Sequence, residues 1–141
     1  MKRKASAIWN GGLKDGNGAI STESGALAAK QYSFSTRFEN GTGTNPEELI
    51  AAAHAGCFSM AFSAELGKAG MNPASITTTA TVNFEKTDAG FTLTAIHLET
   101  VAKVPGATKE AFDAAANAAK VGCPISRVLK AEITLDAKLE A

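Results

Sequence analysis

A chain of 141 residues with 14 acidic and 14 basic side chains has no net charge, and its basic residues are scattered, which excludes nucleic acid as an expected partner. The length fits a single domain over residues 1–141, and the low charged fraction of 20% suits a chain that covers further surface in an oligomer. No apolar run follows the basic residues 1–4, so we expect no signal peptide and a cytoplasmic, reducing location. The two cysteines and two histidines lack ligand spacing, so we expect no metal.

The first 40 residues are rich in strand and turn signals. Short strands are predicted at 5–9 and 19–22, separated by glycine-rich turns. A clearer strand is predicted from Gln31 to Phe38, with aromatic side chains on one face. Arg37 would then be the one strong cation on the opposite face, which otherwise carries small hydroxyls. Its default interpretation is a solvated strand residue.

The central part of the chain predicts one long helix. Asn45 is a good N-cap, a proline follows it at the first helical position, and Glu48 completes the pattern of a capping box. The helix is expected to end near Gly67 or Gly70. It is apolar nearly all round, which is typical of a buried helix, and we expect it to be too short and too rich in small residues to span a membrane. Cys57 would lie where the chain is most enclosed.

The C-terminal half predicts a hairpin, two helices and a last strand. Residues 76–84 alternate, and in the partner strand the apolar phase slips near Ala95, which indicates a bulge or burial on both faces. Thr108 can cap a helix with an apolar stripe, and 131–139 is a strongly alternating strand. The fold class is therefore α+β, with antiparallel strands packed on a central buried helix.

The two thiols occupy different local environments. Cys123 precedes a proline and would be the N-cap of a short helix, where the helix dipole favours the thiolate. Cys57 lies in the middle of an apolar helix, where desolvation should raise its pKa unless a cation is near. Local physics therefore identifies Cys123 as the reactive thiol, while the default for either residue is a small buried hydrophobe.

Other titratable residues have plain structural interpretations. Glu47 complements the dipole of the first helical turn, and ten residues of helix, about 15 Å, separate it from Cys57. A functional link between the two would therefore require a second subunit. His54 lies on the side of Cys57, and we favour a hydrogen-bonded core histidine over a base for the thiol. His97 lies on a strand with no partner in view.

Three segments around these residues resemble the OsmC/Ohr family of thiol-dependent hydroperoxide reductases, and the resemblance extends over essentially the whole chain. These segments are 44–49, 54–61 and 122–126. Three further segments resemble the OsmC branch rather than Ohr: 21–25, 34–39 and 129–136. Gly56 stands where the family usually has alanine, which should loosen the helix only slightly.

The resemblance implies an intertwined homodimer with active sites at the subunit interface. Cys57 matches the peroxidatic cysteine and Cys123 the resolving one, which reverses the assignment from local physics. Arg37 matches the family's active-site arginine and Glu47 the carboxylate that pairs with it, and this leaves open whether they act in the same subunit as Cys57 or in the opposite one. Arg37 would offset the desolvation of Cys57, held by a bidentate pair with Glu47.

The implied activity is reduction of organic hydroperoxides, and more weakly of hydrogen peroxide, in oxidative or osmotic stress. The cycle passes through a sulfenic acid and a disulfide that an external dithiol reduces, and it needs no metal, haem or flavin. The alternative is a stress-induced binding or structural dimer with inert thiols. A general disulfide oxidoreductase is a weaker hypothesis because the chain has no Cys-x-x-Cys motif.

Overall fold

The computed structural model of the protein describes residues 1–140, and the chain divides into two compact units, Met1–Leu49 and the part from Ile50 onward. The first unit contains a three-stranded antiparallel sheet in the order β1–β2–β3. Its strands are β1 (Ala5–Asn10), β2 (Asn17–Thr22) and β3 (Lys30–Tyr32). The strands predicted at 5–9 and 19–22 are therefore confirmed.

The prediction of one strand from Gln31 to Phe38 is wrong, because β3 stops at Tyr32 and a short helix, α1 (Phe34–Phe38), follows. Ser33 caps this helix: its hydroxyl accepts from the N–H of Thr36, and its own N–H donates to the Thr36 hydroxyl. The two phenylalanine rings at the ends of α1 lie one turn apart and pack at 4.8 Å. The aromatic residues that suggested alternation therefore also fit a helical period, and Arg37 lies in the last turn of α1.

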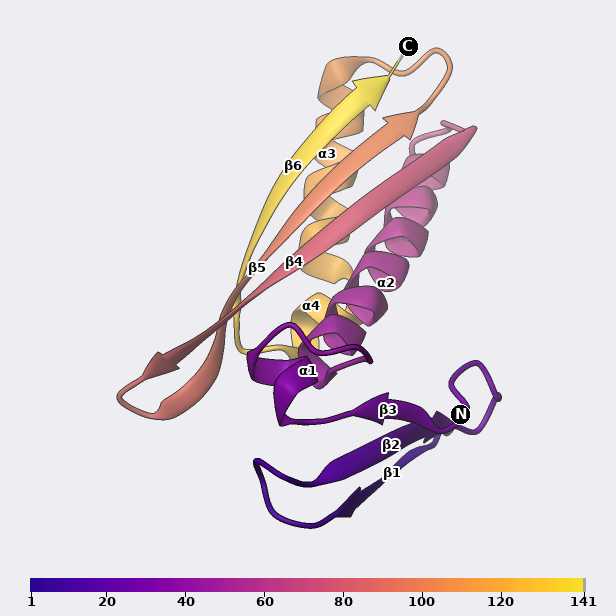
Figure 1. Ribbon diagram of the computed structural model, residues 1–141. Coiled ribbons are helices and arrows are strands. Elements are labelled where there is room, and N and C mark those ends of the chain that lie inside the picture. The colour runs from indigo at the N-terminus through magenta and orange to yellow at the C-terminus, as the bar shows by residue number, and fades with distance from the viewer. Residues whose placement is uncertain (141) are drawn as a thin grey trace. The chain divides into compact units, whose positions relative to one another are not determined.

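The second unit packs helices on one face of a three-stranded sheet, ordered β4–β5–β6 (Figure 1). The strands are β4 (Ser75–Thr87), β5 (Gly90–Lys103) and β6 (Glu132–Glu140). The helices are α2 (Pro46–Lys68), whose first turn belongs to the first unit, α3 (Lys109–Gly122) and α4 (Pro124–Val128). Thr108 caps α3 as predicted, with its hydroxyl accepting from the N–H of Ala111.

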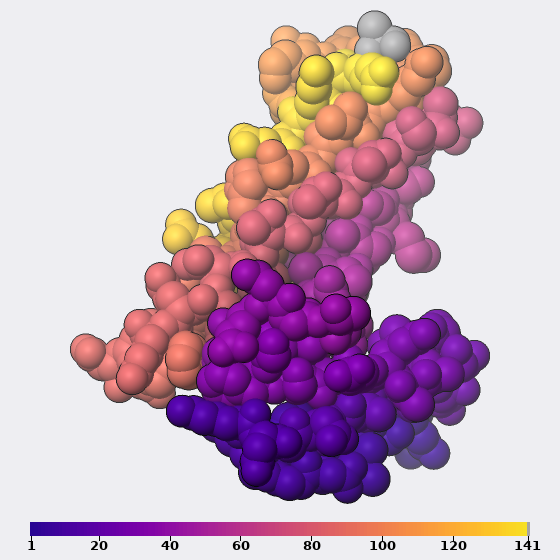
Figure 2. Space-filling view, in the orientation of Figure 1, coloured from indigo at the N-terminus to yellow at the C-terminus, as the bar shows by residue number. Residues whose placement is uncertain are grey.

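The strand pairing of the second unit contains the predicted bulge and one unexpected direction. Asn83 pairs with Ala95 and Phe84 with Leu93, so Thr94 is the extra residue that shifts the apolar phase. β4 and β5 pair antiparallel, but β5 and β6 pair parallel, because α3 and α4 form a crossover connection between them. Figure 2 shows the sheet of the second unit at the surface, and alternate residues of β4 and β6 are exposed there.

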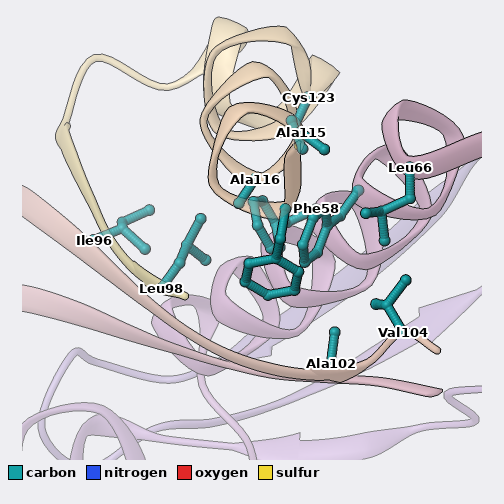
Figure 3. Close-up of a cluster of buried hydrophobic side chains, with 12 residues drawn as sticks. Phe58, Leu66, Ile96, Leu98, Ala102, Val104, Ala115, Ala116 and Cys123 are labelled. Carbon is teal, nitrogen blue, oxygen red and sulfur yellow. The ribbon is translucent and has the colours of Figure 1, made fainter. Parts of the chain in front are cut away.

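The core of the second unit lies between the helices and the sheet (Figure 3). Helix α2 contributes fully buried side chains that are spaced one helical turn apart. The rings of Phe62 and of Phe112 on α3 pack edge to face, with their centres 5.2 Å apart. The buried stripe of α3 is the predicted one: Phe112, Ala115, Ala116 and Ala119. The alternating apolar face of β6 packs against this core, as predicted.

The expectation that α2 is buried all round is wrong for the single chain. The face opposite the core carries small residues and Met60, which is 78% exposed. At 23 residues α2 is also long and apolar enough to cross a membrane, so the length argument against a span fails. Its packing on the sheet through Phe58, Phe62 and Leu66 nevertheless identifies it as a core helix.

Candidate functional site

Two helix positions bring the thiols together. Cys57 lies in the middle of α2, and Cys123 is the residue between α3 and α4, at the predicted N-cap of α4. Their sulfur atoms are 3.0 Å apart, and both thiols are free. Cys123 is fully buried whereas Cys57 is half-buried, so the expectation that Cys57 lies where the chain is most enclosed is wrong. The more accessible sulfur is the one that could meet a substrate.

The environment of Cys57 acts on its thiol in two opposite directions. Burial raises the pKa of Cys57 above its ordinary value, and the close thiol of Cys123 raises this pKa further. The backbone N–H of Ile125, in the first turn of α4, lies against the Cys57 sulfur and lowers the pKa because it stabilises a thiolate. The direction predicted for an uncompensated Cys57 is therefore confirmed, and a cation beside the sulfur would be needed to reverse it.

Arg37 and Glu47 form an ion pair within the first unit. The Nε and Nη2 atoms of Arg37 both donate to Oε1 of Glu47, at 3.0 and 2.8 Å. The pair is thus not the expected bidentate one, because both donors meet a single carboxylate oxygen. The other oxygen of Glu47, Oε2, is buried and accepts no hydrogen bond from the residues that the structure describes. Glu47 is 9% exposed, which makes it a positioned carboxylate rather than a solvated one.

The start of α2 explains why Glu47 is available for this pair. Asn45 caps the helix by accepting from the N–H of Glu48 at 2.7 Å, as predicted. The reciprocal half of the capping box is replaced, because Glu48 accepts from the Thr44 hydroxyl at 2.8 Å. Capping therefore engages Asn45 and Glu48, and the Glu47 side chain is directed to Arg37 instead.

The guanidinium of Arg37 borders an aromatic hollow of about 260 Å³ in the first unit. Trp9, Tyr32, Phe34 and Phe38 contribute to its walls. The guanidinium carbon lies 5.5 Å from the centre of the Phe38 ring, and the Trp9 and Tyr32 rings pack 5.4 Å apart. A cation at the edge of an apolar hollow suits a molecule with an apolar body and a polar, electron-rich end.

His54 is a hydrogen-bonded core residue, as predicted, and it contacts neither thiol through a hydrogen bond. It is fully buried, and its Nε2 lies 2.7 Å from the hydroxyl of Ser126 on α4. Its Nδ1 has no hydrogen-bond partner among residues 1–140, an arrangement that costs about 1–3 kcal/mol for a buried polar group. His97, for which no partner was expected, contacts Thr134 and Asp136 on the neighbouring strand β6.

The burial of His54 predicts a pH dependence of stability. Burial lowers the pKa of His54, so below about pH 6.5 the unfolded chain binds a proton that the folded chain does not. The free energy of unfolding should therefore fall as the pH drops from about 7 to 5, with a smaller slope in a His54→Gln variant. Urea unfolding across this range measures the slopes. His97→Gln is the control, and equal slopes in the wild type and His54→Gln would contradict the prediction.

Ser126 and the N–H of Ile125 were not anticipated from the sequence. The available signal was spacing: Ser126 follows Cys123 by three residues, as Cys57 follows His54, so each pair shares one side of its helix. Arg37 and Glu47 are brought together as predicted, and so are Cys57 and Cys123. The first pair belongs to the unit Met1–Leu49 and the second to the unit that begins at Ile50.

An α+β fold with two free sulfurs 3.0 Å apart defines a dithiol protein whose cysteines can form a disulfide. Among the described residues, no group of three or more histidine, cysteine or acidic side chains is arranged to hold a metal ion.

The family model of the OsmC-like proteins matches residues 39–138. The chain is 55% identical to Peroxiredoxin OsmC of Escherichia coli over 141 residues, which is 100% of this chain and 99% of the relative. It therefore belongs to the OsmC family.

Solved structures agree with this fold. An organic hydroperoxide resistance protein from Elizabethkingia anophelis superposes with a TM-score of 0.70 at 26% identity, covering 99% of each chain. An OsmC-like protein from Mycoplasma pneumoniae reaches a TM-score of 0.77 at 14% identity, over 100% of this chain and 99% of its own.

Proposed function

We propose that the protein is a thiol peroxidase that reduces organic hydroperoxides, and more weakly hydrogen peroxide, in oxidative or osmotic stress defence. The observation that carries this proposal is the pair of free sulfurs at 3.0 Å, one half-buried and one fully buried. The name of the Escherichia coli relative, a peroxiredoxin, supports the same activity. The accessible sulfur of Cys57 then attacks the peroxide, and the buried sulfur of Cys123 completes the cycle.

The proposed reaction has three steps. The Cys57 thiolate attacks the peroxide, so an S–O bond forms, the O–O bond breaks and the alkoxide leaves to take up a proton as alcohol. The Cys123 thiol then displaces hydroxide from the sulfenic acid, forming the disulfide and releasing water with the thiol proton. An external dithiol reduces the disulfide by exchange and is itself oxidised to a disulfide. Short sulfur separation favours the second step because little movement is needed.

Arg37 is the cation that we assign to Cys57. In this proposal its guanidinium faces the thiolate and the departing oxygen, while Glu47 fixes the guanidinium through Nε and Nη2. Because Glu47 precedes Cys57 by ten residues of one helix, about 15 Å, we assign Arg37 and Glu47 to a second copy of the chain. The active site would then combine residues from two subunits.

The exposed face of α2 supports such a homodimer. It carries Ala52, Ala53 and Gly56, which permit close approach of another backbone, together with the exposed Met60. A second copy would cover this face, and light scattering of the purified protein measures the oligomeric state.

The aromatic hollow beside Arg37 supports organic peroxides as substrates. Its apolar walls can accommodate a hydrocarbon group while the guanidinium binds the peroxide oxygens. We place the protein in the cytoplasm as a soluble protein, because two cysteines in a chain of 141 residues do not make a disulfide scaffold of the kind found in oxidising compartments.

Replacing Arg37 by lysine should lower kcat/KM for cumene hydroperoxide about 100-fold, because a lysine cannot reproduce the planar donor fork on Glu47. Peroxide consumption with dithiothreitol as reductant measures the change. Lys68→Arg, a cation exchange in the last turn of α2, is the matched control. An Arg37→Lys variant with the kinetics of the wild type would remove Arg37 from the mechanism.

The same assay tests the proposed function against the binding-protein alternative. A peroxidase consumes many equivalents of cumene hydroperoxide per chain while dithiothreitol is present. A binding or structural dimer consumes none and retains both thiols after peroxide treatment.

A further inference from the structure

A second contact joins the two segments that carry the thiols. His54 precedes Cys57 by three residues on α2, and Ser126 follows Cys123 by three residues on α4. The His54 Nε2 lies 2.7 Å from the Ser126 hydroxyl, and the two sulfurs lie 3.0 Å apart. The two contacts therefore link the same pair of segments, one helical turn apart along each.

The short helix α4 depends on contacts of this kind for its position. It has five residues, and its N-cap, Cys123, provides no side-chain capping bond. A single helical turn is not stable by itself, so tertiary contacts must fix it. Ile125 packs against the core, and within residues 1–140 the side-chain hydrogen bond between α4 and another element is the one from His54 to Ser126.

The position of α4 matters for two groups at Cys57. The Ile125 N–H, in the first turn of α4, lies against the Cys57 sulfur and favours its thiolate. The sulfur of Cys123 stands at the start of the same turn. A shift of α4 would displace the donor and the second thiol together.

The free energy of folding does not explain why the contact between His54 and Ser126 is polar. His54 is fully buried, and its Nδ1 is unpartnered in the described chain, which an apolar side chain of similar size would avoid. A directional hydrogen bond, in contrast, fixes the rotation and distance of α4 relative to α2. That is the property that a reaction between two sulfurs requires.

We propose that His54 and Ser126 are positioning residues that hold α4 so that Cys123 captures the sulfenic acid of Cys57 before a second peroxide does. The proposal rests on the proposed peroxidase function. In the capture step the S–S bond forms, the S–O bond breaks, and hydroxide leaves with the thiol proton as water. In the competing step a second hydroperoxide transfers oxygen to the sulfenic acid, which gives sulfinic acid and an alcohol.

The test is the partition of Cys57 between disulfide and sulfinic acid in a Ser126→Ala variant, measured by intact mass over a series of cumene hydroperoxide concentrations. We expect the concentration that over-oxidises half of the chains to fall about tenfold, because capture is slowed by misplacement of α4. Ser126→Thr keeps the hydroxyl and should show the partition of the wild type. Ser126→Val has the shape of the threonine variant but no hydroxyl, and it should not. The comparison of the threonine and valine variants tests the proposal even if Ser126→Ala fails to fold.

Ser59→Ala is the matched control. Ser59 is also a half-buried hydroxyl residue on α2, with hydrogen bonds of 2.8 Å to Ala55 and Thr78 that do not involve α4. An unchanged partition in Ser126→Ala, or an equal shift in Ser59→Ala, would overturn the positioning role. Wild-type protein that forms no disulfide at all would instead refute the proposed function.

Discussion

Replacing Cys57 by serine should abolish peroxide turnover, with a loss of roughly a thousandfold or more. The hydroxyl has the size of the thiol but is neither ionised nor nucleophilic at neutral pH, so the first O–O cleavage fails. Of the two sulfurs, only this one is partly exposed, so Cys123 cannot take over the attack. The measurement is consumption of cumene hydroperoxide with dithiothreitol in excess.

The control is the thermal unfolding midpoint of Cys57→Ser, because Cys57 packs against the core and a folding defect would also remove activity. A folded variant should keep the Cys123 thiol unreacted after peroxide treatment. Full activity in the folded variant would exclude Cys57 as the attacking residue and return Cys123, the choice of local physics, to that role.

Replacing Cys123 by serine should allow one fast oxidation of Cys57 and then a stall. The first step does not involve Cys123, so the burst should equal one peroxide per chain, after which the sulfenic acid has no thiol 3.0 Å away. Further peroxide should convert the sulfenic acid to sulfinic acid. Stopped-flow peroxide consumption followed by intact mass measures both the burst and its product.

Cys123 is fully buried, so the folded state of this variant needs to be checked as well. Cys123→Ala is a second variant that avoids a buried, unpaired hydroxyl. Repeated turnover of either variant with the same dithiol, at the rate of the wild type, would contradict a resolving role for Cys123.

Local patterns predicted the elements of the second unit well. One hydrophobic period dominates the apolar stripe of α3 and the alternation of β6, because one face of each element is buried. The interruption of that period near Ala95 marks the bulge. The cap at Asn45 and the N-cap position of Cys123 follow from local backbone chemistry. These features depend on neighbours in the sequence, so one sequence was enough to find them.

One local feature was missed: the capping box of Ser33 and Thr36 ends β3 early, although the residues from Gln31 to Phe38 satisfy both strand and helix periods. Features that depend on distant residues were missed or reversed. The relative burial of Cys57 and Cys123 depends on which side chains surround them, which no local pattern reports. The parallel pairing of β6 depends likewise on the crossover through α3 and α4.

The candidate site was predictable only in part for the same reason. Local physics selected Cys123 as the reactive thiol, and the family resemblance was needed to assign Cys57. The bond from His54 to Ser126 spans 72 positions of sequence, so only the folded chain reveals it.

The most direct test of the two-cysteine cycle is a count of free thiols per chain before and after one equivalent of cumene hydroperoxide, together with the intact mass. Both thiols should disappear together, the mass should fall by about two units, and a dithiol should restore both thiols. Two thiols still free after the peroxide would contradict this cycle and would favour a binding or structural protein that shares only the fold of this family.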